Sequence, residues 1–235
     1  MHNYAEWADF CPDEDLEQLR ELLSYDVRCP YSYLLTRSES NCVVPLLPAA
    51  SLHWSRHIEW PWVLRNAFLE SHHKVLDVGS SWSVLKYIIA NRCREVVCVD
   101  NSQLAVDNSL AAVKHFGYEN IICEFADACA LPYPNNSFDR VVSVSVLEHI
   151  ESGWQQAVRE CVRVLKPGGC FVLTVDICLE GSDKGNFYIG REGAVEILNL
   201  LDIAGTCNNH YTIGAGFDEN VKLAVLMMRH VKGGV

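Results

Sequence analysis

The amino-acid sequence predicts an α/β protein built on a doubly wound, mostly parallel sheet. From Lys74 to Ile177, strand-like apolar runs alternate with helix-like segments, which is the pattern of such a sheet. The first run, "KVLDVG", is continuous and ends in turn residues, as expected of a strand buried on both faces. Residues 1–60 lack the alternation and are predicted to form a helical or irregular cap that carries a substrate or lid segment. Residues 61–235 are predicted to form the core domain.

The predicted core elements follow one another in a regular order. Strands are expected within residues 74–79, 94–100, 120–127, 138–150, 170–177 and 221–231. Helices are expected within residues 82–92, 102–117 and 153–169. Ser102 is a suitable N-cap and Gly117 a suitable stop for the second helix. Ahead of the core, Pro61 is expected in the first turn of a helix formed by "WVLRNAFL".

The composition narrows the possible partners. The formal net charge is -11 and the 19 lysines and arginines are scattered, so the basic face that nucleic-acid binding requires is not expected. No apolar run is long enough to span a bilayer, and the acidic start is unlike a signal peptide. The 11 cysteines include no C-x-x-C pair and are expected to be reduced thiols. A cytoplasmic protein without nucleic-acid or membrane partners is predicted.

The turn after the first predicted strand, "GSSWSV", begins at Gly79 and raises the question of its ligand. Doubly wound sheets bind ligands at the carboxyl ends of their strands, and Asp100 ends the second strand where a carboxylate can bind both ribose hydroxyls. A dinucleotide would require G-x-G-x-x-G for its pyrophosphate. Here the second and third glycines are absent, and Trp82 would crowd the phosphates. The remaining candidate is an adenosine with an amino-acid tail.

Four stretches in order resemble the successive motifs of class I S-adenosylmethionine-dependent methyltransferases of the UbiE-like branch: "VLDVGSSWS", "VVCVDNS", "FADACALPYPNNSFDRVVSVSVLEHI" and "RVLKPGGCFVLTV". The resemblance covers Lys74 to Ile177. It implies a seven-stranded Rossmann-like sheet, S-adenosyl-L-methionine as the cofactor, S-adenosyl-L-homocysteine as the product, and no metal. The departure is in the first motif, where Ser81 and Ser83 replace glycines of the family pattern.

Carried over residue by residue, the resemblance implies a cofactor site and a candidate base. The implied cofactor contacts are Asp77, Gly79, Ser80 and Ser81 for the methionine part, Asp100, Asn101 and Ser102 for the ribose, Asp127 and Ala128 for the adenine, and Ser143 and Ser145 near the sulfonium. Each aspartate could instead cap a helix or end a loop. His149 in "LEHI" is a possible general base, or it stabilises the loop together with Glu148. A Glu–His metal site is a third option, although no further acidic residues cluster in the nearby sequence.

Acceptor selection is expected from the segments that flank the core. The stretch "LHWSRHIEWPW" would form either a lid over the cofactor or a helix that closes the bottom of the sheet. In the lid interpretation the acceptor contacts are Trp54, Arg56, His57 and Trp60, joined by Tyr188 and Arg191 from "GNFYIGREGAVEIL". A role at the start of a helix is the alternative for Tyr188 and Arg191.

The sequence therefore predicts a methyltransferase that uses S-adenosylmethionine and acts on oxygen or nitrogen of a small-molecule acceptor in a biosynthetic pathway. A macromolecule methyltransferase is one alternative. Against it, "SVSVLEH" lacks the asparagine-proline-proline-aromatic tetrad of relatives that methylate nucleobases or protein amides. A catalytically inactive binding or regulatory protein is the other alternative, because the glycine turn has lost two glycines.

Overall fold

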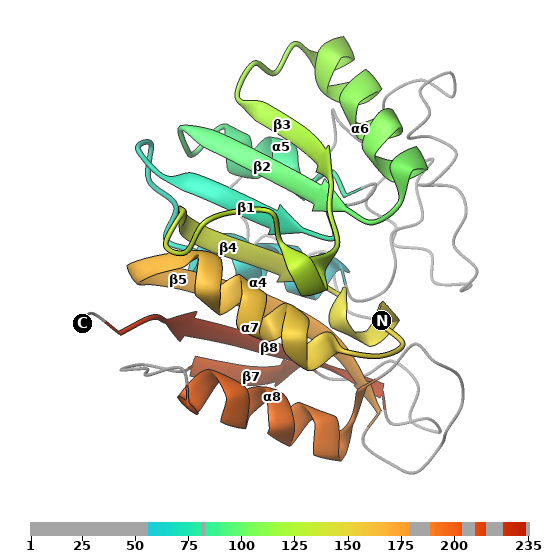
Figure 1. The fold of residues 1–235 in the computed structure, drawn as a ribbon, viewed down its shortest axis with the longest axis vertical. Helices are drawn as coiled ribbons and strands as arrows, with labels where there is room; N and C mark the ends of the chain where they lie inside the picture. Colours follow the sequence, from blue (N-terminus) through green and yellow to red (C-terminus); the bar gives the residue numbers. More distant parts are fainter. Residues whose placement is uncertain (1–55, 81–82, 179–188, 204–209, 215–222, 234–235) are drawn as a thin grey trace.

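The computed structural model describes residues 56–80, 83–178, 189–203, 210–214 and 223–233 (Figure 1). Within these ranges one sheet has the strand order β3-β2-β1-β4-β5-β8-β7, and the two-residue strand β6 pairs with β5. The strands are β1 (Lys74–Val78), β2 (Glu95–Asp100), β3 (Ile121–Phe125), β4 (Phe138–Val144), β5 (Leu165–Cys178), β6 (Ile189–Gly190), β7 (His210–Gly214) and β8 (Leu223–Val231). All pairs are parallel except those of β8 with β5 and β7. The predicted doubly wound, mostly parallel sheet is confirmed.

The order of the strands reverses between β1 and β4. The first three strands run outward from β1 to the edge strand β3, and the chain then returns to place β4 on the other side of β1. Ligands of open α/β sheets bind outside the carboxyl ends of the strands at such a switch point. The turn after β1 and the segment after β4 both lie at this position.

Helices cover both faces of the sheet. Helices α4 (Arg56–Asn66), α5 (Leu85–Ala90) and α6 (Gln103–Phe116) pack on one face, and α7 (Trp154–Val164) and α8 (Arg191–Ile203) pack on the other, in front of the sheet in Figure 1. Strand β5 shows the division, because Cys170 and Val172 belong to the first core and Phe171 and Leu173 to the second. Neighbouring residues of a strand point to opposite faces, so a strand covered on both sides is apolar throughout.

Helix α4 begins earlier than expected. It includes Arg56, so Pro61 lies in the interior of the helix and not in its first turn. A proline lacks the N–H that would bond the carbonyl four residues earlier, so the helix loses one backbone hydrogen bond. Burial of Trp60 and Val63 in the core beneath the helix offsets this cost. The part of the predicted cap before residue 56 lies outside the described residues.

Helix α6 begins and ends where the sequence predicts. Ser102 Oγ accepts a hydrogen bond from the Ala105 N–H at 3.3 Å, and Gly117 ends the helix in the left-handed conformation with φ 74°. Both the N-cap and the stop are therefore confirmed. Because Asp100 ends β2 two residues before this cap, the capped helix fixes where the Asp100 carboxylate lies.

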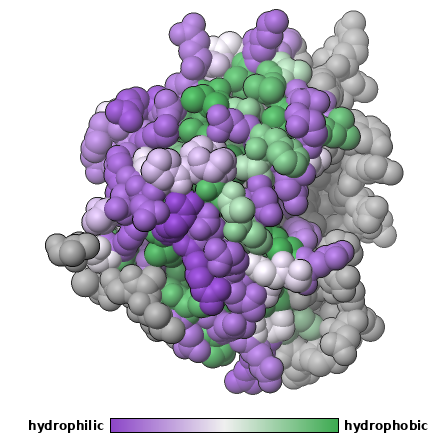
Figure 2. Space-filling view, in the orientation of Figure 1, coloured by the Kyte–Doolittle hydropathy of each residue, from purple (hydrophilic) through white to green (hydrophobic). Residues whose placement is uncertain are grey.

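The surface on the side of α7 and α8 is mostly hydrophilic, but hydrophobic residues gather toward the end of the molecule where β2 and β3 lie (Figure 2). Ile122 of the edge strand β3 is exposed, and on the opposite face Ile121 and Cys123 are buried in the core that includes α6. Phe125, the last residue of β3, is also exposed. Helices α7 and α8 pack near β5, and the face of β3 that carries Ile122 is exposed.

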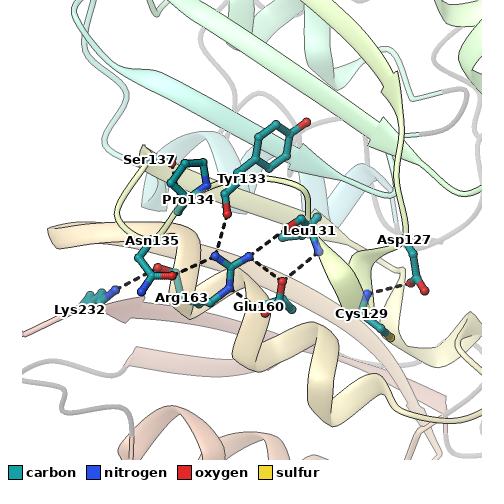
Figure 3. Close-up of polar contacts among 10 residues, drawn as sticks. All are labelled: Asp127, Cys129, Leu131, Tyr133, Pro134, Asn135, Ser137, Glu160, Arg163 and Lys232. Carbon is teal, nitrogen blue, oxygen red and sulfur yellow. Dashed lines mark hydrogen bonds and ion pairs between the residues drawn. The ribbon is translucent and has the colours of Figure 1, made fainter.

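A single arginine fastens the segment between β3 and β4 to helix α7 (Figure 3). Arg163 binds the Glu160 carboxylate through two hydrogen bonds of 2.8 and 2.7 Å. It also donates to the carbonyls of Leu131 at 2.9 Å and Tyr133 at 2.7 Å. The buried Glu160 carboxylate in turn accepts from the Leu131 N–H at 2.9 Å. This segment follows Asp127, so the arginine anchors the loop that carries the implied adenine contact.

We expect Arg163→Ala to lower the free energy of unfolding by about 2–3 kcal/mol, because the change leaves a buried carboxylate and two carbonyls without their donor. Arg159→Ala is the matched control, since Arg159 is exposed on the same helix. Its cost should stay within about 0.5 kcal/mol. Urea denaturation measures both variants, and equal effects would show that the arginine does not anchor the loop.

Candidate functional site

The turn that follows β1 needs its single glycine for two reasons. Gly79 adopts φ 64°, a left-handed conformation that side chains disfavour. In addition, a Cβ at this position would lie 2.4 Å from Cγ2 of Val146. Val146 follows β4, so the turn after β1 and the segment after β4 pack directly against each other. The absence of a side chain at Gly79 therefore leaves room for Val146 of the protein itself, and not only for a ligand.

Asp77 is a buried carboxylate beside this turn. Burial raises the pKa of Asp77 to about 6, while the charge of Lys86 opposes the shift. Lys86 lies on α5, is fully buried, and donates through Nζ to Ser109 Oγ of α6 at 2.8 Å. Among the described residues, Asp77 Oδ2 is buried without a hydrogen-bond partner. A buried carboxylate oxygen of this kind needs a donor, which a bound ligand can supply.

Ser80 and Ser143 lie on either side of the same switch point. The Ser80 N–H donates to the carbonyl of Val99 at 3.0 Å, which ties the turn to β2. Ser143, on β4, is fully buried, and its Oγ forms no hydrogen bond within the described part of the chain. Asp77 Oδ2 and Ser80 Oγ are likewise buried without a partner in the described part of the chain, although the Ser80 hydroxyl lies close enough to Asp77 to lower the pKa of that carboxyl. Three buried polar atoms therefore lie at the carboxyl ends of β1 and β4. The residues present therefore fit a polar ligand such as the amino-acid tail of the cofactor. Ser81 and Trp82 lie outside the described residues.

The implied ribose and adenine contacts lie at the ends of β2 and β3. Asp100 is half-buried, and its Oδ1 accepts from the Ser102 N–H at 2.9 Å. Asn101 and Ser102 are exposed beside it. Asp127 is exposed after β3, and its Oδ1 accepts from the Cys129 N–H at 2.8 Å, while Ala128 begins the short 3-10 helix that Asp127 caps. The two aspartates thus have local capping roles, and both stand at the same edge of the sheet.

Helix α4 contributes a buried carboxylate, that of Glu59, on the side of the site formed by β4 and β5. Glu59 is 0% exposed, and its carboxylate accepts hydrogen bonds from Arg56 of the same helix and from Thr174 Oγ1 of β5. Ser145, just after β4, donates to Glu59 Oε1 at 2.6 Å and accepts from Arg56 Nη1 at 2.6 Å. Ser145 has φ 49°, an unfavourable conformation for a residue with a side chain. Arg56 and Ser145 are among the predicted site residues, whereas Glu59 and Thr174 are not.

Two further carboxylates lie next to this group. Glu148 and Asp176 are 5% and 6% exposed, and Glu148 Oε1 accepts from the Asp176 N–H at 2.9 Å. Burial raises the pKa of Asp176 to about 7, and Glu59 adds to the shift while Arg56 opposes it. Burial also raises the pKa of Glu148 well above its usual value, and the charge of Asp176 adds to this. Burial disfavours the charge of Arg56, but Glu59, Asp176 and Glu148 outweigh it and raise its pKa.

His149 lies at the rim of this group. It ends the 3-10 helix Leu147–His149 and its side chain is exposed. Partial loss of contact with water lowers the pKa of His149, and the charge of Arg56 lowers it further. A histidine with a lowered pKa is neutral at physiological pH, which is the form that can accept a proton.

The structure separates the other residues predicted to contact the acceptor. Trp54 and Tyr188 lie outside the described residues, and His57 belongs to α4. Trp60 is 3% exposed and packs in the core between α4 and the sheet. Arg191 is exposed at the first position of α8, as the alternative of a role at a helix start expected. Arg56 is the predicted acceptor contact that lies beside His149 and the buried carboxylates among the described residues.

A group of possible metal ligands occurs elsewhere among the described residues. Glu70, His72 and His73 bring their ligand atoms within 4.8 Å of one another. His73 Nδ1 already accepts from the Glu70 N–H at 2.9 Å, so the proton of the neutral ring lies on Nε2. The group precedes β1 and thus lies at the opposite end of that strand from Gly79. It does not contribute to the candidate site.

The core of the chain is similar to known proteins. Residues 76–173 match the family model described as a methyltransferase domain. The chain is 30% identical over 111 residues to the uncharacterized methyltransferase YcgJ of Bacillus subtilis, which covers 47% of this chain and 44% of that protein. It is 30% identical over 138 residues to a probable S-adenosylmethionine-dependent methyltransferase of Mycolicibacterium smegmatis, covering 56% of this chain and 51% of that protein. The chain spans about half the length of these curated relatives.

A solved structure with a similar fold is phosphoethanolamine N-methyltransferase 2 of Haemonchus contortus in complex with S-adenosyl-L-methionine. Its TM-score is 0.64 at 17% identity, over 77% of this chain and 53% of that chain. At this identity the likeness establishes the fold alone. Within the described residues, no helix combines the length and apolar character needed to cross a membrane.

We expect Gly79→Ala to lower the free energy of unfolding by about 3 kcal/mol, since it combines a left-handed backbone with a clash against Val146. Gly117→Ala is the matched control, because φ is 74° there but nothing lies within 4 Å of the added Cβ. Val146→Ala should reduce the cost of Gly79→Ala and leave that of Gly117→Ala unchanged. A double-mutant cycle from urea denaturation measures the coupling. Equal coupling of Val146 to both glycines would contradict the packing described.

Proposed function

Because the chain belongs to the class I S-adenosylmethionine-dependent methyltransferases, we propose that it transfers the methyl group of S-adenosyl-L-methionine to a small-molecule acceptor in the cytosol. Oxygen or nitrogen of a metabolite in a biosynthetic pathway is the proposed target, and S-adenosyl-L-homocysteine is the product.

One observation carries the proposal. Asp77 Oδ2, Ser80 Oγ and Ser143 Oγ are buried polar atoms without partners among the described residues, and they lie at the carboxyl ends of the two strands that flank the switch point. Buried polar atoms are nearly always hydrogen-bonded in folded proteins. An ammonium group on the methionine tail would supply a donor to Asp77 in this arrangement. The cofactor, when bound, supplies a methyl group already activated by the sulfonium.

The residues of the chain divide the work of binding and positioning. Asp100 would bind the ribose hydroxyls, and Asp127 would accept from the adenine amino group. The segment after β4 would hold the acceptor in line with the methyl group and exclude water, which is the main task of an enzyme in a displacement of this kind. His149, neutral at pH 7, would take a proton from an acceptor that must lose one.

The net charge of -11 supports a small-molecule acceptor over a nucleic acid. A protein that kept the fold and binds without transferring methyl groups is the second candidate, favoured by the serines that replace glycines after Gly79. Calorimetry and a transfer assay together distinguish the two candidates. Failure to bind both S-adenosyl-L-methionine and S-adenosyl-L-homocysteine overturns the transferase. Binding together with transfer of labelled methyl to a screened acceptor supports it.

We expect Asp100→Asn to weaken binding of S-adenosyl-L-methionine by about tenfold or more, since the ribose hydroxyls lose a charged acceptor. The asparagine keeps an oxygen for the Ser102 N–H, so the start of α6 should be preserved. Asp107→Asn, an exposed change on α6, is the control and should leave the affinity unchanged. Calorimetric titration measures both, and an unaltered affinity in Asp100→Asn would mean that the ribose binds elsewhere.

His149→Ala should lower the rate of methyl transfer at neutral pH with little change in cofactor affinity, because the residue takes a proton and does not hold the cofactor. Transfer of labelled methyl to acceptors found by screening measures the rate, and calorimetry measures the affinity. With a lowered pKa, His149 is protonated and inactive only in acid, so the wild-type rate should fall only when the pH drops below the ordinary titration range of histidine. If the His149→Ala variant retained the full rate across this range, the histidine would be structural.

A further inference from the structure

More carboxyl groups than cations surround the segment after β4. Carboxylates from three elements meet there: Glu59 from α4, Glu148 from the 3-10 helix after β4, and Asp176 from β5. Arg56 is the described cation among them, and it is bound to Glu59. All three carboxylates are at least nine-tenths buried, so water does little to screen them. The group is called the carboxylate cluster below.

The carboxylate cluster also has unused hydrogen-bonding capacity. Glu148 Oε2 and Asp176 Oδ1 are buried and have no partner within the described part of the chain. The other oxygen of Glu148 is fixed by the Asp176 N–H at 2.9 Å, so the two side chains are held side by side. If the pair shares one proton and Glu59 is balanced by Arg56, one negative charge remains in the interior.

The carboxylate cluster adjoins the proposed cofactor contacts. Ser145, which donates to Glu59 at 2.6 Å, lies two residues beyond Ser143. Val146, the next residue, packs on the turn at Gly79. The carboxylates of Glu148 and Asp176 follow on the β5 side of the same edge. The excess negative charge therefore lies beside the site and not on a remote surface.

We propose that this carboxylate cluster makes the site selective for the positively charged sulfonium of S-adenosyl-L-methionine over the neutral thioether of S-adenosyl-L-homocysteine. The inference rests on the proposed function. The two molecules differ by one methyl group and one positive charge, so a buried negative charge distinguishes them through charge alone. Loss of the charge on methyl transfer weakens the hold on the product and favours its release.

The experiment compares the affinities of the two molecules in each protein by calorimetry. Glu148 and Asp176 share one negative charge, so the double variant Glu148→Gln/Asp176→Asn is needed to remove it while keeping the size of both side chains. The double variant should reduce the preference for S-adenosyl-L-methionine by about tenfold, the order expected for one unit charge in a partly water-excluded site. Each single variant leaves one carboxyl to carry the charge and should have a smaller effect. Most of the change should fall on S-adenosyl-L-methionine. Glu196→Gln removes an exposed charge of the same sign on α8 and should leave the preference unchanged.

The ratio of the two affinities is the decisive quantity. Partial unfolding of a variant weakens both affinities by the same factor, so it cancels from the ratio. A ratio that stays at the wild-type value in the double variant Glu148→Gln/Asp176→Asn overturns the inference. If the wild-type protein binds neither molecule, the proposed function itself has failed, and this outcome is distinct from the first.

The preference should also depend on pH. As the pH rises from 5.5 to 7.5, Asp176 loses its proton, the negative charge grows and the preference for S-adenosyl-L-methionine should increase. The charged groups around Asp176 are Arg56 and Glu59 from α4 and Glu148 from the neighbouring 3-10 helix, while its partner on β8 is the apolar Val225. Asp77 titrates in the same range, but on the proposed function it would bind the ammonium group, which both molecules share. The increase should be reduced in Asp176→Asn, whereas an unchanged increase there would assign it to another group and contradict the inference.

Discussion

The arrangement of the candidate site depends on one buried carboxylate. Glu59 is 0% exposed, and it joins three elements through hydrogen bonds from Arg56 on its own helix, Ser145 after β4 and Thr174 on β5. A buried charge is tolerated only when it is paired and fully hydrogen-bonded, so these partners cannot move independently. Helix α4 is thereby fixed over the carboxyl ends of β4 and β5. Because Ser145 belongs to this network, the segment that would meet the acceptor is set by a residue far earlier in the sequence.

Local features near the switch point are unfavourable for stability, and they concentrate where the site is proposed. Gly79 and Ser145 have left-handed backbones, and Asp77 is buried with a pKa raised to about 6 by loss of water. Each is a cost that the rest of the fold must offset. The sheet between its two apolar layers provides that stability. Unfavourable groups at one edge of an otherwise regular sheet are expected of a functional site.

The sequence predicts the sheet well, because strands buried on both faces are continuous apolar runs and the turns between them carry strong signals. The N-cap at Ser102 and the stop at Gly117 follow from local chemistry and are found in the structure. The sequence predicts Pro61 in a first turn, where its missing N–H is harmless, whereas in the structure tertiary burial extends the helix on both sides of it. Glu59, Thr174 and Asp176 could not be recognised as one group. Their proximity results from packing of α4 on β5, and no spacing in the sequence encodes it.

The shape of the turn after β1 explains why charged side chains would be needed to recognise the cofactor in this protein. In nucleotide-binding turns, several glycines allow the backbone to approach a ligand closely. Here the space beside Gly79 is filled by Val146, and Ser83 uses its hydroxyl to accept from the Leu85 N–H at 3.2 Å at the start of α5. Backbone approach is therefore restricted, and recognition must depend more on side chains. S-adenosyl-L-methionine carries two positive charges on its amino-acid part, an ammonium and a sulfonium. On the proposed function, Asp77 would bind the ammonium and the carboxylate cluster would attract the sulfonium, one on each side of the switch point.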